Sequence, residues 1–93
     1  MKNKIKRIHF IGIGGSGMSG IAEVMQTLGF TVSGSDLAIS DTIKSLKKLG
    51  IKVYSEHSKA NIKKVDTIVF SNAISRNNPE LIEAKKNKIP MIS

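Results

Sequence analysis

The chain has 93 residues, of which 40% are hydrophobic and none is cysteine, so one small domain fits and disulfides or thiolate metal sites are excluded. Fifteen basic against 7 acidic residues give a net charge of +8, which favours anionic ligands, while the scarcity of aromatic residues argues against a nucleic-acid surface. The basic start of the chain precedes an apolar run too short for a membrane span or signal peptide, so we expect a cytoplasmic protein without membrane partners.

The first predicted strand, residues 8–13, runs into a glycine-rich turn. Gly12, Gly14 and Gly17 have the G-x-G-x-x-G spacing, and helical spacing of apolar residues follows over 18–28. In that motif the first glycine permits a tight turn, the second lets a pyrophosphate approach the backbone, and the third lets helix and strand pack closely. Free N–H groups at the helix start would face the anion. The stretch predicts a phosphate-binding loop, with a glycine-rich turn that binds nothing as the alternative.

A second strand over residues 30–35 ends directly before Asp36. The dinucleotide fingerprint places an acidic residue about 20 positions after the glycines, where it accepts hydrogen bonds from ribose hydroxyls. Asp36 stands at that spacing from Gly17. The alternative is that Asp36 is a turn or cap residue.

The rest of the chain continues to alternate between strands and helices. Ser40 or Asp41 caps a helix that ends at Gly50, and Asn78, Pro79 and Glu80 read as the N-cap, first position and first-turn acid of another helix. Further strands are predicted over 51–54, 67–71 and 89–92, with a short helix between residues 56 and 66. The fold class is therefore α/β, a Rossmann-like three-layer domain with a five-stranded parallel sheet in the order 3-2-1-4-5. Because the last strand runs to the end of the sequence, we expect residues 1–93 to form a single domain at the N-terminal part of a longer multidomain chain.

Ligands of open parallel sheets lie beyond the carboxyl ends of the strands, so the polar residues there are the candidate site. His57 follows the third strand and either binds a phosphate or caps the short helix. His9 lies within the first strand and is expected to be a packing residue. No His, Asp or Glu cluster has metal-ligand spacing and no nucleophile–base pair is apparent, so we predict no metal site and no catalytic residue.

Four short motifs, at residues 12–20, 33–36, 71–74 and 78–80, together resemble the N-terminal domain of the Mur ligases, in particular of those that add the first amino acid, L-alanine, to UDP-N-acetylmuramate. The resemblance covers nearly the whole chain. It implies a Rossmann-like domain that binds the UDP of a sugar nucleotide, in peptidoglycan precursor synthesis, rather than a dinucleotide.

The same resemblance assigns substrate contacts to particular residues. The glycine loop would cradle the diphosphate, the carboxylate after the second strand would take the uridine ribose, the histidine would lie near the phosphates, and the loop after the fourth strand would line the uracil side. The implied UDP-binding residues are Gly14, Gly15, Ser16, Gly17, Met18, Asp36, His57, Ser71, Asn72, Ala73 and Ile74.

Full-length Mur ligases use ATP and Mg²⁺ to phosphorylate the muramate carboxylate, after which the alanine amine attacks the acyl phosphate. No G-x-x-x-x-G-K-[ST] loop occurs in this chain. The resemblance therefore implies that the chain alone is inactive, binds no cofactor, and has as partners the central and C-terminal domains of the same polypeptide. Three alternatives stay open: a related ligase that recycles murein peptides, an NAD(P)-binding domain of a dehydrogenase or nucleotide-sensing regulator, and a basic nucleic-acid-binding module.

Overall fold

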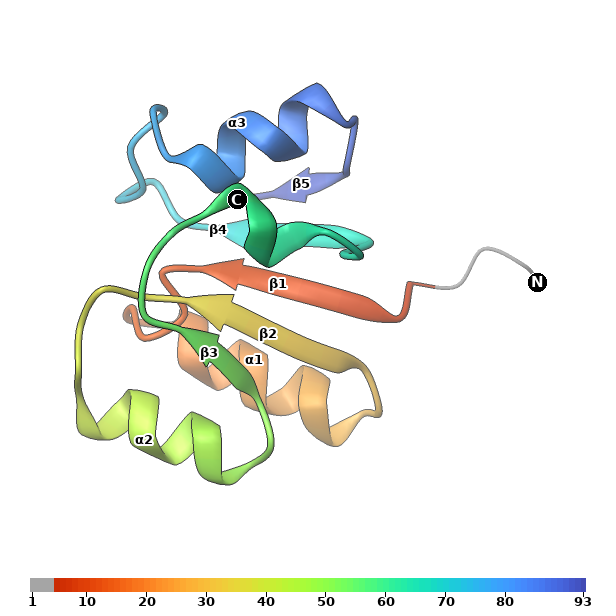
Figure 1. The fold of residues 1–93 in the computed structure, drawn as a ribbon. Coiled ribbons are helices and arrows are strands. Elements are labelled where there is room, and N and C mark those ends of the chain that lie inside the picture. Colours follow the sequence, from red (N-terminus) through yellow and green to blue (C-terminus); the bar gives the residue numbers. More distant parts are fainter. Residues whose placement is uncertain (1–4) are drawn as a thin grey trace.

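The computed structural model describes residues 5–93, so the first part of the basic N-terminal stretch lies outside the described residues. Its strands are β1 (Arg7–Ile11), β2 (Thr31–Ser35), β3 (Lys52–Tyr54), β4 (Thr67–Phe70) and β5 (Met91–Ile92). Its helices are α1 (Met18–Thr27), α2 (Asp41–Lys48), the 3₁₀ helix η1 (Lys59–Ile62) and α3 (Pro79–Lys86). All strand pairs are parallel and the sheet order is β3-β2-β1-β4-β5 (Figure 1), which confirms the predicted fold class.

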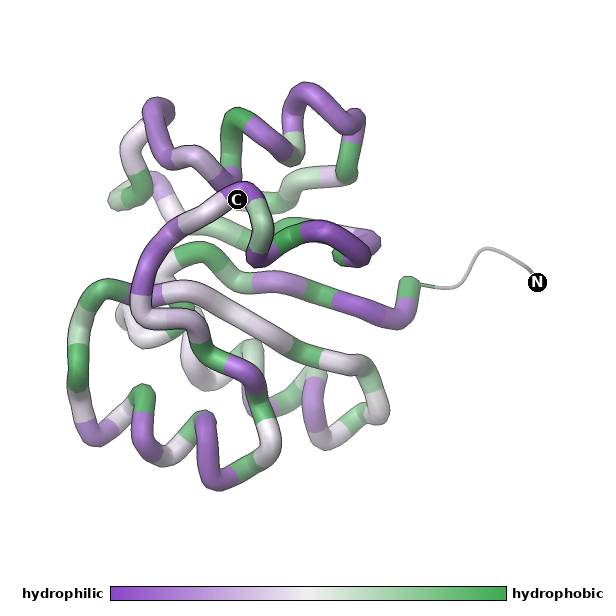
Figure 2. The backbone as a smooth tube through the Cα atoms, viewed as in Figure 1, coloured by the Kyte–Doolittle hydropathy of each residue, from purple (hydrophilic) through white to green (hydrophobic). Residues whose placement is uncertain are grey.

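The helices form a layer on each side of the sheet. Crossovers between parallel strands are right-handed, so α1 and α2, which carry the chain from β1 towards β3, share one face, and the return through η1 and α3 runs over the other. Accordingly α1 packs with α2 and α3 packs with η1 (Figure 1). In Figure 2 hydrophobic and hydrophilic residues alternate along α2, and its buried residues are Ile43 and Leu46. None of the helices within residues 5–93 is long and apolar enough to cross a membrane.

The central strand β1 supplies both cores. Phe10 points to the side of α1 and α2, where it joins a cluster that includes Met18 and Val32. Ile11 points to the other side and packs with Ile68 of β4 and others below α3. Because successive side chains of a strand alternate between faces, a strand buried on both sides reads as a continuous apolar run, as predicted here.

The strand ends differ from the prediction. β1 ends at Ile11 rather than residue 13 because Gly12 takes a left-handed conformation with φ of +77°, which turns the chain out of the sheet. β5 is limited to Met91–Ile92, since Pro90 has no N–H to give to the ladder.

Close packing between the first turn and the sheet depends on Gly34 in β2. A Cβ atom added there would lie 2.6 Å from Cβ and Cδ1 of Ile13, a distance that atoms do not tolerate. The chain after β1 therefore passes directly over the second strand. Only a residue without a side chain permits this crossing.

We predict that Gly34→Ala lowers the free energy of unfolding by about 1–3 kcal/mol, because the added methyl overpacks against Ile13. Gly20→Ala in α1 is the matched control: a Cβ there meets nothing within 4 Å, and alanine favours a helix over glycine by up to about 1 kcal/mol. Urea unfolding of both variants measures the difference. Equal stability of Gly34→Ala and the parent would contradict the close approach.

Candidate functional site

The polar loops predicted to form the site meet at the carboxyl edge of the sheet. The carbonyl of Ser35, at the end of β2, accepts hydrogen bonds from the N–H groups of Gly12 (2.8 Å) and Ile13 (3.1 Å). On the other side of β1, Ile74 reaches Gly12, where an added Cβ would lie 2.9 Å from Cδ1 of Ile74. The glycine loop is thus held between the segments that follow β2 and β4.

The glycine loop folds into two successive tight turns. The N–H of Gly15 donates to the carbonyl of Gly12 (2.9 Å), and the N–H of Met18 donates to the carbonyl of Gly15 (3.0 Å). Gly14 has no room for a side chain, because a Cβ would lie 2.9 Å from Cδ1 of Ile43 and 3.0 Å from Oδ2 of Asp36. The loop is therefore packed against the region between β2 and α2.

The predicted reason for the third glycine is wrong. Gly17 is the residue before α1, and a Cβ there would meet nothing within 4 Å. Its φ of +80° is instead a left-handed conformation that residues with side chains rarely adopt. Glycine is required at this position by backbone conformation, while Gly34 is the glycine that allows close packing.

Four backbone N–H groups at the start of α1 are available to a ligand. Those of Ser16, Gly17, Ser19 and Gly20 have no acceptor within residues 5–93. The helix has no side-chain cap at Gly17 and no acidic residue in its first turn. N–H groups at a helix start carry partial positive charge and are normally satisfied by a cap, water or an anion. The loop therefore presents an open anion-binding position.

Asp36 is bound to the glycine loop as well as to its own turn. Its Oδ2 accepts the N–H of Gly14 (2.8 Å), and its Oδ1 accepts the N–H of Ala38 (2.9 Å). Asp36 is therefore a turn residue, which was the alternative expected from the sequence. Each carboxylate oxygen has further lone pairs and Asp36 is only half-buried, so the carboxylate can also accept hydroxyl donors from a ligand.

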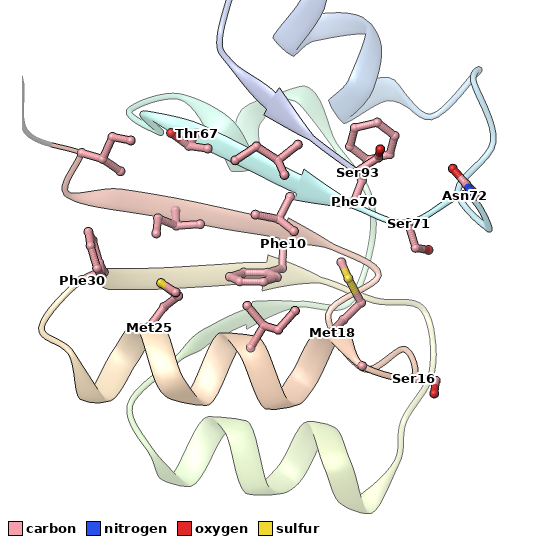
Figure 3. Close-up of a pocket in the computed structure, with 16 residues that line it drawn as sticks. Phe10, Ser16, Met18, Met25, Phe30, Thr67, Phe70, Ser71, Asn72 and Ser93 are labelled. Carbon is pink, nitrogen blue, oxygen red and sulfur yellow. The ribbon is translucent and has the colours of Figure 1, made fainter.

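A groove of about 680 Å³ begins at this edge and extends over the sheet beside α1 (Figure 3). Its floor is apolar and includes Phe10 and Met25. Ser16 at the glycine loop, and Ser71 and Asn72 after β4, lie together at one end of it (Figure 3). The structure therefore brings the predicted loop residues of β1 and β4 to a common opening.

The loop after β4 is short of internal contacts. Ser71 Oγ accepts the N–H of Ala73 (3.3 Å), and the carbonyl of Ser71 accepts the N–H of Ile74 (3.1 Å). Asn72 and Ala73 are exposed. The side-chain amide of Asn72 is therefore accessible to a ligand.

The Asn78-Pro79-Glu80 motif does more than begin α3. As predicted, Asn78 caps the helix, its Oδ1 accepting the N–H of Glu80 (2.9 Å), and Pro79 is the first helical residue. Glu80, however, is completely buried. The sequence identified Glu80 only as a first-turn acid and did not reveal the network that it organises.

Four donors surround the buried carboxylate of Glu80. His9 Nε2 and Ser35 Oγ each lie 2.8 Å from Oε1, and the N–H of Ser58 and Nδ2 of Asn61 lie 3.0 and 2.7 Å from Oε2. Burial raises the pKa of Glu80, but the hydrogen bond and charge interaction with His9, together with the other donors, outweigh it and hold the pKa below its ordinary value. The carboxylate is therefore ionised and fully hydrogen-bonded inside the protein.

His9 is a packing residue, as predicted. It is buried, and its Nδ1 lies 2.8 Å from Ser33 Oγ while Nε2 contacts Glu80. The sequence does hold a signal for this network. His9 interrupts the apolar run of the first strand, Ser33 and Ser35 alternate along the second, and the register pairs His9 with Ser33 on one face. Buried polar groups need hydrogen-bond partners, so these positions indicate a polar network on this face of the sheet without identifying Glu80 as its centre.

Comparison with known proteins gives the family. The model of the "Mur ligase family, catalytic domain" matches residues 7–93. The chain belongs to the Mur ligase family. Among relatives of Mur ligase type, the UDP-N-acetylmuramate–L-alanine ligases of Polaromonas sp. and Endomicrobium trichonymphae are 52% and 57% identical over 99% and 97% of this chain.

Solved Mur ligase structures have the same fold in this region. The UDP-N-acetylmuramate–alanine ligase of Thermotoga maritima superposes with a TM-score of 0.89 at 35% identity over 96% of this chain. A UDP-N-acetylmuramate:L-alanyl-γ-D-glutamyl-meso-diaminopimelate ligase of Neisseria meningitides gives 0.87 at 34% identity over 97%. The chain spans 20% of the length of the two curated relatives, 20% of the Thermotoga chain and 29% of the Neisseria chain.

The buried carboxylate predicts a pH dependence of stability. A pKa below the ordinary 4.5 means that ionised Glu80 stabilises the fold above about pH 4.5 and that this contribution is lost as the pH falls through the lowered pKa. Glu80→Gln should therefore lower the free energy of unfolding by about 1–3 kcal/mol at pH 7.

The difference between parent and Glu80→Gln should shrink as the pH falls below about 4.5. Asp66, whose pKa is lowered chiefly by the N–H groups of Arg7 and Lys6, also loses stabilising contacts in acid. That effect is common to both proteins and cancels in the comparison. Urea unfolding from pH 7 to pH 3 measures the difference, and a constant value would contradict the assignment.

Proposed function

We propose that this chain is the part of a UDP-N-acetylmuramate–L-alanine ligase that binds the UDP group of the sugar-nucleotide substrate. The observation that carries the proposal is the set of four open N–H groups at the start of α1, next to a loop held rigidly by Ser35 and Asp36. Such a position suits a diphosphate, which brings several acceptor oxygens and negative charge. The relatives are ligases whose names contain a UDP-linked sugar.

The proposal divides the substrate among the loops. The diphosphate lies against residues 14–18, the ribose hydroxyls donate to Asp36, and the uracil lies beside the loop that contains Ser71, Asn72, Ala73 and Ile74. Support comes from the meeting of these loops at one edge and from the opening that Ser16, Ser71 and Asn72 share (Figure 3). His57, which follows β3, belongs to the same edge and contacts Ser35.

ATP and Mg²⁺ do not fit the described residues. Residues 5–93 contain no group of three or more His, Asp or Glu side chains that could hold a metal ion, and the glycine loop is followed by Met18 where an ATP-binding loop has lysine. We therefore assign the phosphorylation of the muramate carboxylate, and its attack by alanine, to the parts of the full-length ligase beyond this chain. This chain holds one end of the substrate.

Two neighbouring functions are less well supported. A dehydrogenase would share the glycine loop and the acid after β2, but the family match is to ligases. A ligase that is named for L-alanyl-γ-D-glutamyl-meso-diaminopimelate in place of L-alanine has the same fold, as the Neisseria structure shows, at 34% identity. The solved UDP-N-acetylmuramate–alanine ligase of Thermotoga maritima, at 35% identity, does not separate the two, and the choice of L-alanine as the amino acid rests on the 52% and 57% identities to the L-alanine ligases of Polaromonas sp. and Endomicrobium trichonymphae.

Titration of the ¹⁵N-labelled chain with UDP tests the proposal. We expect the amide signals of Ser16, Gly17, Ser19 and Gly20 to shift, with weak affinity because the surfaces that would close over the substrate are absent. Uridine, which has no phosphate, is the matched control and should leave these four signals in place. Shifts with NAD but not with UDP would contradict the ligase assignment and favour a dinucleotide site.

A further inference from the structure

The ring of His57 is anchored at one nitrogen and open at the other. Its Nδ1 lies 2.7 Å from Ser35 Oγ, and its Nε2 has no hydrogen-bond partner within residues 5–93. The ring is half-buried. Since the carbonyl of Ser35 also holds the N–H of Gly12, His57 stands beside the residue on which the glycine loop rests.

The hydrogen atoms of this contact can be assigned by counting. The Ser35 hydroxyl has a single hydrogen and lies 2.8 Å from Oε1 of Glu80. An ionised carboxylate accepts only, so Ser35 donates its hydrogen to Glu80. Ser35 Oγ must then accept from His57, which places a hydrogen on Nδ1. In a neutral imidazole the other nitrogen, Nε2, is consequently an acceptor.

We propose that Glu80 is a positioning residue that acts through Ser35 to hold His57 in its Nδ1–H form, so that Nε2 accepts a hydrogen bond from a hydroxyl group of the sugar nucleotide. The ligand part of this inference rests on the proposed function. A phosphate oxygen has no hydrogen to donate, so neutral His57 held in this way does not match the diphosphate, which was one of the two roles left open by the sequence and the one that the family resemblance implies. Hydroxyl groups fit better, and Asp36, the residue proposed for the ribose, directly follows Ser35.

Replacing Glu80 by glutamine should move the hydrogen of the His57 ring from Nδ1 to Nε2. The N–H of Ser58 and the amide of Asn61 both donate to Oε2, so the amide oxygen of glutamine would stay there and its NH₂ group would face His9 and Ser35. Ser35 Oγ would then accept from the NH₂ group. Its own hydrogen becomes free for Nδ1 of His57, and the ring hydrogen moves to Nε2.

Nitrogen NMR of the His57 ring, at a pH where the ring is neutral, tests this relay without any ligand. In the parent we expect a protonated Nδ1 and an unprotonated Nε2, and in Glu80→Gln the reverse. In Ser35→Ala, which removes the link, adding Glu80→Gln should leave the His57 signals unchanged. A parent with hydrogen on Nε2, or the same form in parent and Glu80→Gln, would overturn the proposal. If the amide spectrum shows Glu80→Gln to be unfolded, Ser35→Ala decides alone: it must abolish the preference for Nδ1–H.

A second experiment repeats the nitrogen NMR of His57, and measures binding, after UDP-N-acetylmuramate is added to the parent and to Glu80→Gln. Nε2 of the parent should remain unprotonated in the complex, and Glu80→Gln should bind about tenfold more weakly because a donor replaces the acceptor. Protonation of Nε2 on binding would indicate a phosphate contact and overturn the hydroxyl assignment. If the amide signals of residues 16–20 in the parent do not shift, the proposed function is contradicted. The NMR result without ligand would still decide whether Glu80 controls the hydrogen position on His57.

Discussion

The buried carboxylate of Glu80 is the constraint on which the carboxyl edge of this domain depends. An ionised group inside a protein costs several kcal/mol unless donors replace its water. Here the donors come from β1, β2, the segment after β3 and η1, so satisfying one charge fixes four parts of the chain relative to α3. The parts of the chain that follow β2 and β3 are positioned by this requirement as much as by the sheet.

The glycine loop is held in its turn by the segment that the carboxylate positions. Ser35 uses its hydroxyl for Glu80 and its carbonyl for the first two amides after β1, and Asp36 takes the next free amide, that of Gly14. The amides of Ser16, Gly17, Ser19 and Gly20 are left without partners within the described residues. A rigid loop with free donors needs no rearrangement to receive an anion, and preorganisation of this kind is what makes weak individual contacts add up to binding.

The sequence predicts where the helices and strands lie. It predicts less well what individual residues such as Gly17 and Glu80 do in the structure. The apolar run of β1, the helical spacing of α1 and the caps of α2 and α3 are local patterns, and each lies in the structure within a few residues of its predicted place. The role of Gly17 was assigned from a motif, whereas the structure shows that its left-handed backbone is what calls for glycine. The crowding at Gly34 depends on how Ile13 crosses β2. Glu80 looked like an ordinary first-turn acid because its partners lie 19 to 71 positions away in sequence. The polar residues His9, Ser33 and Ser35 indicate that a network exists, but nothing in the sequence around residue 80 marks Glu80 as their partner.

The central claim is that the open amides at the start of α1 bind the diphosphate of a uridine nucleotide. A crystal structure of the chain with UDP tests it most directly. We expect diphosphate oxygens within about 3 Å of the backbone nitrogens of Ser16 and Gly17, with the ribose hydroxyls directed to Asp36. UDP bound elsewhere on the chain, or bound at this edge with its diphosphate in solvent and the four amides still unpartnered, would contradict it.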